Sequence, residues 1–207
     1  IRDPGGVALT TEFEVDDLGR VTGREAPYGA RTDIAWTDID RRESATGPGV
    51  GPGNDRPTTR FSYDAAGRLI QRETQLLDHD GAELKASPLV ETFAYDRFGR
   101  EVKRTRGPAS DPREQVRTRA YNRANQPRRL TSWRGAITRM EYDQRQRLAE
   151  VTRAVGTADE FTVEREYDSM GRLVAETDGR GERTTREYDA FGRLESIERP
   201  DGSKRSF

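Results

Sequence analysis

One short motif returns along the sequence at intervals of 21 residues or more, and this repetition restricts the fold more than any other feature. Four copies are plain, and they read Tyr63-Asp64-Ala65-Ala66-Gly67-Arg68, Tyr95-Asp96-Arg97-Phe98-Gly99-Arg100, Tyr167-Asp168-Ser169-Met170-Gly171-Arg172 and Tyr188-Asp189-Ala190-Phe191-Gly192-Arg193. Four degenerate copies begin at Val15, Trp36, Tyr121 and Tyr142. Successive starts lie 21, 27, 32, 26, 21, 25 and 21 residues apart, so a unit of 21 residues with insertions accounts for all of them.

The fifth position of the motif predicts a residue with positive φ. It is Gly in five copies and Asp40, Asn125 or Gln146 in the others. Gly adopts the left-handed region freely, and Asp and Asn tolerate it better than other residues do. Gln146 fits this position least, and we expect a distorted turn there.

Each motif therefore predicts the tip of a β-hairpin. An Asp side chain at the second position can accept hydrogen bonds from backbone N–H groups ahead of it and start a type I turn. Gly three residues later supplies the left-handed residue of a G1 bulge. The structural turn positions that we predict with most support are Tyr63, Asp64, Gly67, Arg68, Tyr95, Asp96, Gly99, Arg100, Tyr167, Asp168, Gly171, Arg172, Tyr188, Asp189, Gly192 and Arg193.

A second, looser turn separates each tip from the next, as in Thr177–Gly181, Pro200–Gly202 and Asp80-Gly81. Each unit then contains two strands, for which 173–177 and 183–188 are examples. No segment shows a sustained helical period. The sequence therefore predicts an all-β chain of antiparallel hairpin repeats.

Residues 1–207 form a single repeat array in this interpretation, with flexible insertions at about 43–59, 75–91 and 107–114. The first insertion is rich in Gly and Pro, and the second is expected to extend a hairpin around Asp80-Gly81. The chain begins at Ile1 without Met, and Phe207 stands two positions before the next expected Tyr. We expect the chain to be a fragment of a longer array.

Composition supports an ordered sheet with thin apolar layers. Hydrophobic residues make up only 31% of the chain and charged residues 35%, but the net charge is −1 and the aromatic residues recur at fixed places. The balanced charge gives no sign of a nucleic-acid partner. Local arginine clusters, at Arg128-Arg129 and around Thr118, are expected to form cross-strand ion pairs with the acidic residues among them. No stretch is apolar enough to predict a membrane span.

The residues that usually carry chemistry are scarce. The chain has no Cys, which excludes disulfides and thiolate metal sites, and one His. His79 lies between Asp78 and Asp80, where a metal ligand or a base can be considered, but the Asp-Gly that follows favours a solvated turn. The motif aspartates recur at every tip, as turn formation requires, whereas a catalytic pair would occur once. We therefore expect no catalytic residue, no metal site and no cofactor; calcium-binding nonapeptides are absent as well.

Two further recurring positions have structural interpretations. The motif arginines can brace neighbouring strands or stack on aromatic rings, although a groove for a polyanion or carbohydrate is an alternative. The residue before the fifth position is apolar in most copies, namely Leu18, Ile39, Phe98, Met170 and Phe191. These side chains predict that tips pack against neighbouring tips.

The motif Tyr-Asp-x-x-Gly-Arg at steps of 21 residues or slightly more resembles the YD repeats of the RHS and teneurin superfamily. That superfamily includes bacterial RHS polymorphic toxins, wall-associated proteins, the B and C components of insecticidal toxin complexes, and teneurins. The resemblance runs from about Phe13 to Phe207. It implies a long antiparallel sheet that spirals into a hollow shell around a toxic polypeptide. The aspartyl self-cleavage segment common in the family is not found, and Asp3-Pro4 and Asp111-Pro112 are interpreted as turns.

Two functions follow as hypotheses. The first is a non-catalytic segment of an RHS-type shell that encloses or presents a toxin or effector in an exported bacterial protein, secreted or at the cell surface. Its partners would be the remainder of the shell, an enclosed toxin domain, and immunity or delivery proteins. The alternative is a cell-surface adhesion module in which the sheet face or the inserted loops bind carbohydrate or protein.

Overall fold

The computed structural model describes residues 10–50, 53–84, 87–108 and 115–207, and within them the chain is all-β, as predicted. Every paired strand is antiparallel, and the helical content described is a single 3₁₀ turn, η1 (Pro27–Gly29). The chain divides into two compact units, Ile1–Gln115 and Val116–Phe207. Each unit is a meander in which a strand pairs with the next strand along the chain.

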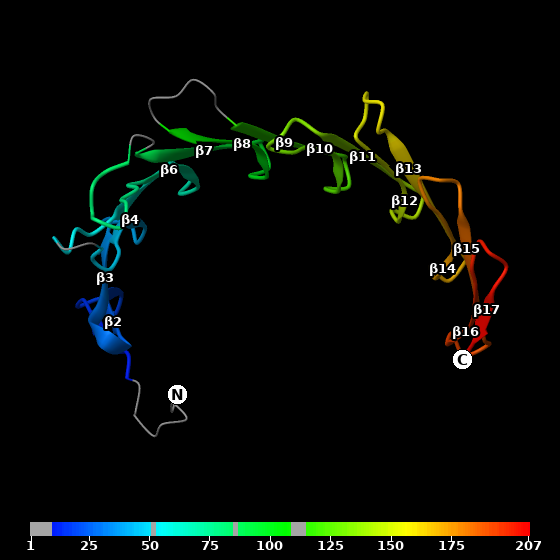
Figure 1. Ribbon diagram of the computed structural model, residues 1–207, viewed down its shortest axis with the longest axis horizontal. Coiled ribbons are helices and arrows are strands. Elements are labelled where there is room, and N and C mark those ends of the chain that lie inside the picture. Colours follow the sequence, from blue (N-terminus) through cyan, green and yellow to red (C-terminus); the bar gives the residue numbers. More distant parts are fainter. Residues whose placement is uncertain (1–9, 51–52, 85–86, 109–114) are drawn as a thin grey trace. The chain divides into compact units, whose positions relative to one another are not determined.

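Unit 1 contains eight strands that follow one another in a single layer (Figure 1). They are β1 (Glu12–Val15), β2 (Val21–Ala26), β3 (Ala30–Trp36), β4 (Arg42–Thr46), β5 (Thr58–Tyr63), β6 (Leu69–Thr74), β7 (Leu89–Tyr95) and β8 (Glu101–Pro108). All seven consecutive pairs are antiparallel.

Unit 2 repeats this plan with nine strands. They are β9 (Gln115–Tyr121), whose first residue closes unit 1, β10 (Pro127–Thr131), β11 (Ile137–Tyr142), β12 (Leu148–Arg153), β13 (Phe161–Tyr167), β14 (Leu173–Thr177), β15 (Arg183–Tyr188), β16 (Leu194–Glu198) and β17 (Lys204–Ser206). Consecutive strands again pair antiparallel. The two strand examples predicted from sequence, 173–177 and 183–188, are β14 and β15.

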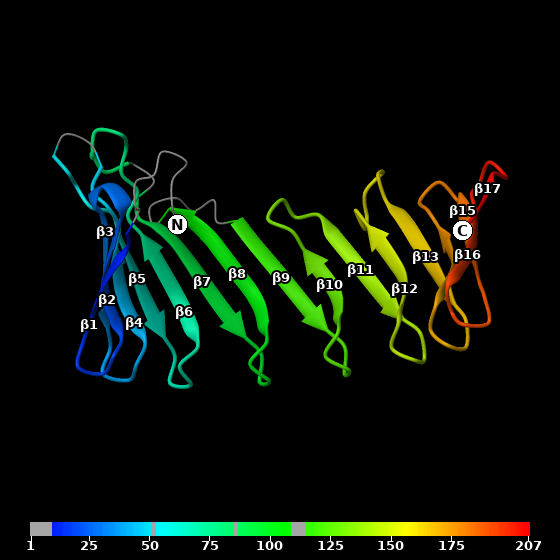
Figure 2. The same ribbon diagram turned by 90° about the horizontal axis from the view of Figure 1, so that it is seen from below.

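The motif turns join alternate strand pairs, and within each unit they lie along the same edge of the sheet (Figure 2). The register of every motif hairpin shifts where the incoming strand meets the first residue of the motif, as between Glu166 and Tyr167 or between Glu187 and Tyr188. Such a shift is the bulge that a type I turn followed by a left-handed residue produces. The opposite edge carries the insertions and the second set of turns. The prediction that these turns are looser is wrong: in the turn between β14 and β15 the N–H of Asp178 donates to the carbonyl of Glu182 and the N–H of Gly181 to the carbonyl of Asp178, each at 2.9 Å, and Gly181 has φ of 82°.

Little apolar surface is buried. Among the described residues, Val151 and Ala175 are the only hydrophobic side chains that are buried. A single layer has no facing layer on which to form a core. Cross-strand pairs take its place, and on several hairpins they are Thr–Thr hydrogen bonds, joining Thr46 to Thr58, Thr59 to Thr74, Thr92 to Thr105, Thr118 to Thr131 and Thr152 to Thr162.

The insertions are shorter than the sequence indicates. β4 continues to Thr46 and β5 begins at Thr58, so the first connection is 47–57. Its base is tied down, because Arg56 donates hydrogen bonds to the carbonyl oxygens of Gly47 (2.9 Å) and Arg31 (3.0 Å). The second connection, 75–88, contains the expected hairpin, with Leu77 bridged to Glu83. The third falls at 109–114, outside the described residues.

No helix in the described part of the chain has the length and apolar character that crossing a membrane requires.

Candidate functional site

The repeated hairpin tips are the constellation that the sequence singles out, and all eight share one backbone frame. The N–H of the second residue donates to the carbonyl of the sixth, and the N–H of the fifth donates to the carbonyl of the second, at 2.7 to 3.2 Å. The fifth residue has φ between 62° and 90° in every copy. The positive φ predicted at this position is therefore confirmed, for Asp40 and Asn125 as well as for the five glycines.

The aspartate at the second position uses both carboxylate oxygens within its own tip. In the tip that begins at Tyr167, Asp168 Oδ1 accepts from the N–H groups of Met170 and Arg172, each at 2.9 Å. Its Oδ2 accepts from Arg172 Nε at 2.6 Å. The same three bonds recur at the other five tips that have Asp here, namely those of Asp16, Asp64, Asp96, Asp143 and Asp189.

These bonds lower the pKa of each tip carboxyl. For Asp168 the main cause is the backbone hydrogen bond from Arg172, and for Asp64 and Asp96 it is the side-chain hydrogen bond from the motif arginine. A hydrogen bond to the charged form favours ionisation. The carboxylates are thus held as anions, and their oxygens accept hydrogen bonds from within the turn.

The motif arginine connects its tip to the following one. Arg147 pairs with Asp143 of its own tip, stacks over the ring of Tyr167 at 4.6 Å, and donates through Nη1 to the carbonyl of Asp168 at 2.9 Å. Arg68 and Arg172 stack in the same way over the next motif aromatic, at 4.9 and 4.8 Å. The recurring arginines therefore brace neighbouring hairpins, as one of the two interpretations of the sequence expects.

The motif tyrosine makes the reciprocal connection to the preceding tip. Its hydroxyl donates to the carbonyl of the seventh residue of that tip: Tyr95 to Leu69, Tyr142 to Pro127, Tyr167 to Leu148 and Tyr188 to Leu173, at 2.7 to 2.9 Å. Burial raises the pKa of Tyr95 and Tyr142. Sequence reasoning treated the aromatic as a packing residue and missed this bond. The signal was present, because every aromatic that begins a copy carries a polar hydrogen.

The degenerate copies keep the frame by substitution. Trp36 donates its Nε1–H to the carbonyl of Val21 at 2.9 Å, in the place of a tyrosine hydroxyl. Asn122 Oδ1 accepts from the N–H of Gln126 at 2.9 Å, as an aspartate would. The distortion expected at Gln146 is wrong. Gln146 has φ of 66° and donates its N–H to Asp143 at 2.9 Å, because the frame around it imposes the left-handed conformation.

The apolar residues at the tips do not pack as predicted. Their exposed fractions are 75% for Leu18, 70% for Ile39, 67% for Phe98, 77% for Met170 and 87% for Phe191. The turn directs the fourth side chain away from the sheet, so it projects beyond the edge. The tips are joined by arginine and tyrosine bonds instead of apolar contacts.

The ion pairs expected at Arg128-Arg129 are also not formed. Among the described residues neither guanidinium has a carboxylate within ion-pair distance. The residue directly opposite Arg129 on β11 is Arg139, because the register places the two in the same row.

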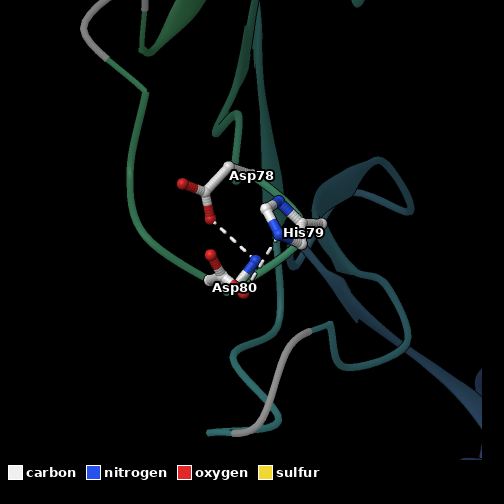
Figure 3. Close-up of side chains that lie close together, drawn as sticks. All are labelled: Asp78, His79 and Asp80. Carbon is white, nitrogen blue, oxygen red and sulfur yellow. Dashed lines mark hydrogen bonds and ion pairs between the residues drawn. The ribbon is translucent and has the colours of Figure 1, made fainter.

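Asp78, His79 and Asp80 lie close together at the turn of the 75–88 connection (Figure 3). Their candidate ligand atoms are within 4.8 Å of one another. Oδ1 of Asp78 already accepts from the N–H groups of Asp80 and Ala82, each at 2.9 Å, which is the bonding of a motif tip. The His79 side chain is 88% exposed and lies 3.2 Å from Asp80. The arrangement is accounted for by the turn.

Residues 166–204 match the protein-family model described as RHS Repeat. The matched segment contains the tips that begin at Tyr167 and Tyr188 together with the β14–β15 turn between them. No curated protein matches the chain.

Crystal structures of TcdB2-TccC3 and a structure of a Tc holotoxin pore are among the solved structures that match at low identity. The crystal structure of TcdB2-TccC3 without its hypervariable C-terminal region is 17% identical, with a TM-score of 0.47, over 90% of this chain and 13% of the other. For the crystal structure of TcdB2-TccC3 the values are 18%, 0.47, 90% and 13%. For the Tc holotoxin pore of Photorhabdus luminescens they are 17%, 0.47, 90% and 12%. This chain thus spans a small part of the length of each matched chain.

Proposed function

We propose that this chain belongs to the RHS-repeat family and is a non-catalytic wall segment of an RHS-type β-sheet shell. The shell would enclose or present a toxin or effector in an exported bacterial protein. The partners proposed for it are the remainder of its own repeat shell, the enclosed polypeptide, and the immunity or delivery proteins that accompany such toxins. The proposed role is mechanical: the chain would join its hairpins into a continuous wall, and the wall would cover the enclosed polypeptide.

The observation that carries the proposal is the pair of bonds between successive tips. The arginine of one tip reaches forward to the next aromatic and carbonyl, as Arg147 does, and the aromatic of the next tip reaches back, as Tyr167 does. Each hairpin is therefore stabilised by its neighbours, as in other repeat proteins. Further hairpins can be added at the end of the array by the same pair of bonds, and no thick apolar core is needed to hold them.

The thinness of the sheet supports the same role. Within the described residues, the buried polar side chains Glu91, Thr105, Thr152 and Ser196 outnumber the buried hydrophobic ones. A single wetted layer covers the largest area for a given length of chain. This property suits a container wall and gives no advantage to a compact enzyme.

Electron microscopy of the full-length parent protein tests the proposal. A closed shell with density inside it, and with these hairpins in its wall, is the expected result. An open or rod-shaped array with an empty concave face would overturn enclosure and favour adhesion.

A further inference from the structure

Arg129 and Arg139 are directly opposite each other on the paired strands β10 and β11. Among all the strand pairings described, this is the one place where two basic residues face each other. Like charges directly opposite in an antiparallel pair are destabilising. Elsewhere the sheet often places Glu or Asp near Arg. At this row two guanidinium groups repel each other instead, and this repulsion lowers the stability of the sheet locally.

A hollow of about 410 Å³ lies over this row, and it is lined by Arg128, Arg129, Arg139, Met140 and Glu141. Arg128 is the residue that the bulge between Pro127 and Arg129 adds to β10, and this bulge brings a third guanidinium to the hollow. In the part of the chain that the structure describes, none of the three arginines forms an ion pair or a side-chain hydrogen bond. Their donors therefore face solvent together.

The chemistry of the lining indicates what the hollow would accept. A guanidinium presents its N–H donors in a planar fork that matches the oxygens of phosphate, sulfate or carboxylate in pairs. Three guanidinium groups carry more positive charge than a ligand with a single carboxylate can neutralise. A ligand that is a multiply charged oxyanion is therefore the better counterpart. We propose that Arg128, Arg129 and Arg139 form a binding site for a compact oxyanion, namely a phosphate or sulfate group.

The neighbouring row limits the size of the ligand. Glu141 follows Arg139 by two residues on β11, so the two side chains leave the same face about 7 Å apart. Glu141 is opposite Glu150, which is opposite Glu164 on β13. Three carboxylates in a row repel any anion that extends beyond the arginines. The site would therefore take a small oxyanion, or the terminal group of a larger molecule, in preference to a long polyanion.

Titration calorimetry of the full chain with sodium phosphate, at constant ionic strength set by sodium chloride, tests this proposal. We expect measurable binding that weakens by at least about tenfold in R129Q/R139Q, because the paired donors are lost. R24Q/R180Q is the matched control, since it removes two exposed arginines outside the hollow, and it should bind phosphate as the unaltered chain does. Thermal unfolding gives a second readout: phosphate should raise the midpoint of the unaltered chain and not that of R129Q/R139Q.

The remaining arms separate the sources of the anion. Tighter binding of a sugar phosphate monoester than of inorganic phosphate would assign the site to a group on a larger molecule, and equal binding would assign it to the free ion. Tightest binding of a heparin fragment would overturn the preference for a compact ligand. Absence of phosphate binding, or an equal loss in R24Q/R180Q, would overturn the site itself. None of these outcomes depends on whether the parent protein forms a closed shell.

Discussion

The hydroxyl of Tyr188 donates a hydrogen bond to the backbone carbonyl of Leu173, 15 residues earlier in the chain, at 2.9 Å. The bond joins two neighbouring hairpins and not the two strands of one. Because the other described tips with this bond use the same seventh-position carbonyl, the contact is a property of the repeat.

Replacing Tyr188 by Phe should lower the free energy of unfolding by about 1 kcal/mol, since a net hydrogen bond is lost while the ring remains. Tyr28→Phe is the matched control, because Tyr28 is 92% exposed and its hydroxyl has no described partner. Urea unfolding followed by circular dichroism measures both. An equal effect of the two substitutions would contradict a role for the inter-hairpin bond.

Replacing Gln146 by Gly should stabilise the chain by about 1 kcal/mol, because Gly adopts the positive φ of 66° without the steric cost that Gln bears. Gln144→Gly changes the same turn at a residue without positive φ, and there the added backbone freedom should be slightly destabilising. Differential scanning calorimetry of the two variants compares the signs. If both variants shift the midpoint downwards, the frame does not strain Gln146.

Stability should fall in acid. The tip aspartates have pKa values lowered from the ordinary 3.8 by hydrogen bonds from the motif arginine and the turn backbone. A group with a lowered folded-state pKa stabilises the fold above its unfolded pKa, and this contribution is lost as pH falls through the folded value. The urea midpoint should therefore be level at neutral pH and decline below about pH 4.

Asp168→Asn supplies the control for this pH dependence. The amide oxygen of Asn can still accept both backbone N–H groups, as Asn122 shows for the N–H of Gln126, but the amide has no acidic proton to titrate. The variant should start from a lower midpoint at neutral pH and lose less of it in acid. An unchanged acid decline would show that carboxyl groups other than Asp168 dominate it.

Phe191→Ser should leave the free energy of unfolding almost unchanged, because the Phe191 side chain is 87% exposed. Val151→Ala should cost about 2 kcal/mol, since Val151 is one of the few buried hydrophobic side chains and its loss leaves a gap. Chemical denaturation distinguishes the two. A large loss for Phe191→Ser would mean that the tips pack together after all.

The sequence predicted the strands and turns well because both depend on local chemistry. An Asp followed by Gly three residues later specifies its turn without help from the rest of the chain, and β14 and β15 begin and end where the pattern placed them. The same logic failed at Gln146, where the surrounding hydrogen bonds override the preference of the residue.

Contacts between hairpins were harder to predict because they depend on register. Arg129 lies opposite Arg139 because the turn at 132–136 sets the register between β10 and β11, and the sequence analysis did not fix the register of that turn. The turn likewise sets the direction in which Phe98 and Phe191 project. The apolar character of a residue does not predict that direction. The reach of Tyr188 to Leu173 required knowing which strands are neighbours.

The lengths of the hydrogen bonds between tips do not depend on the number of residues that separate the bonded residues in the chain. Tyr95 reaches Leu69 across 26 residues and Tyr188 reaches Leu173 across 15, yet the oxygen–oxygen distances are 2.7 and 2.9 Å. The additional residues leave and re-enter at the other edge of the sheet, away from the bonds that join one motif tip to the next. At one edge of the sheet, successive tips are therefore joined by bonds of constant length. The other edge can accept inserted sequence, even a whole folded domain, without lengthening those bonds.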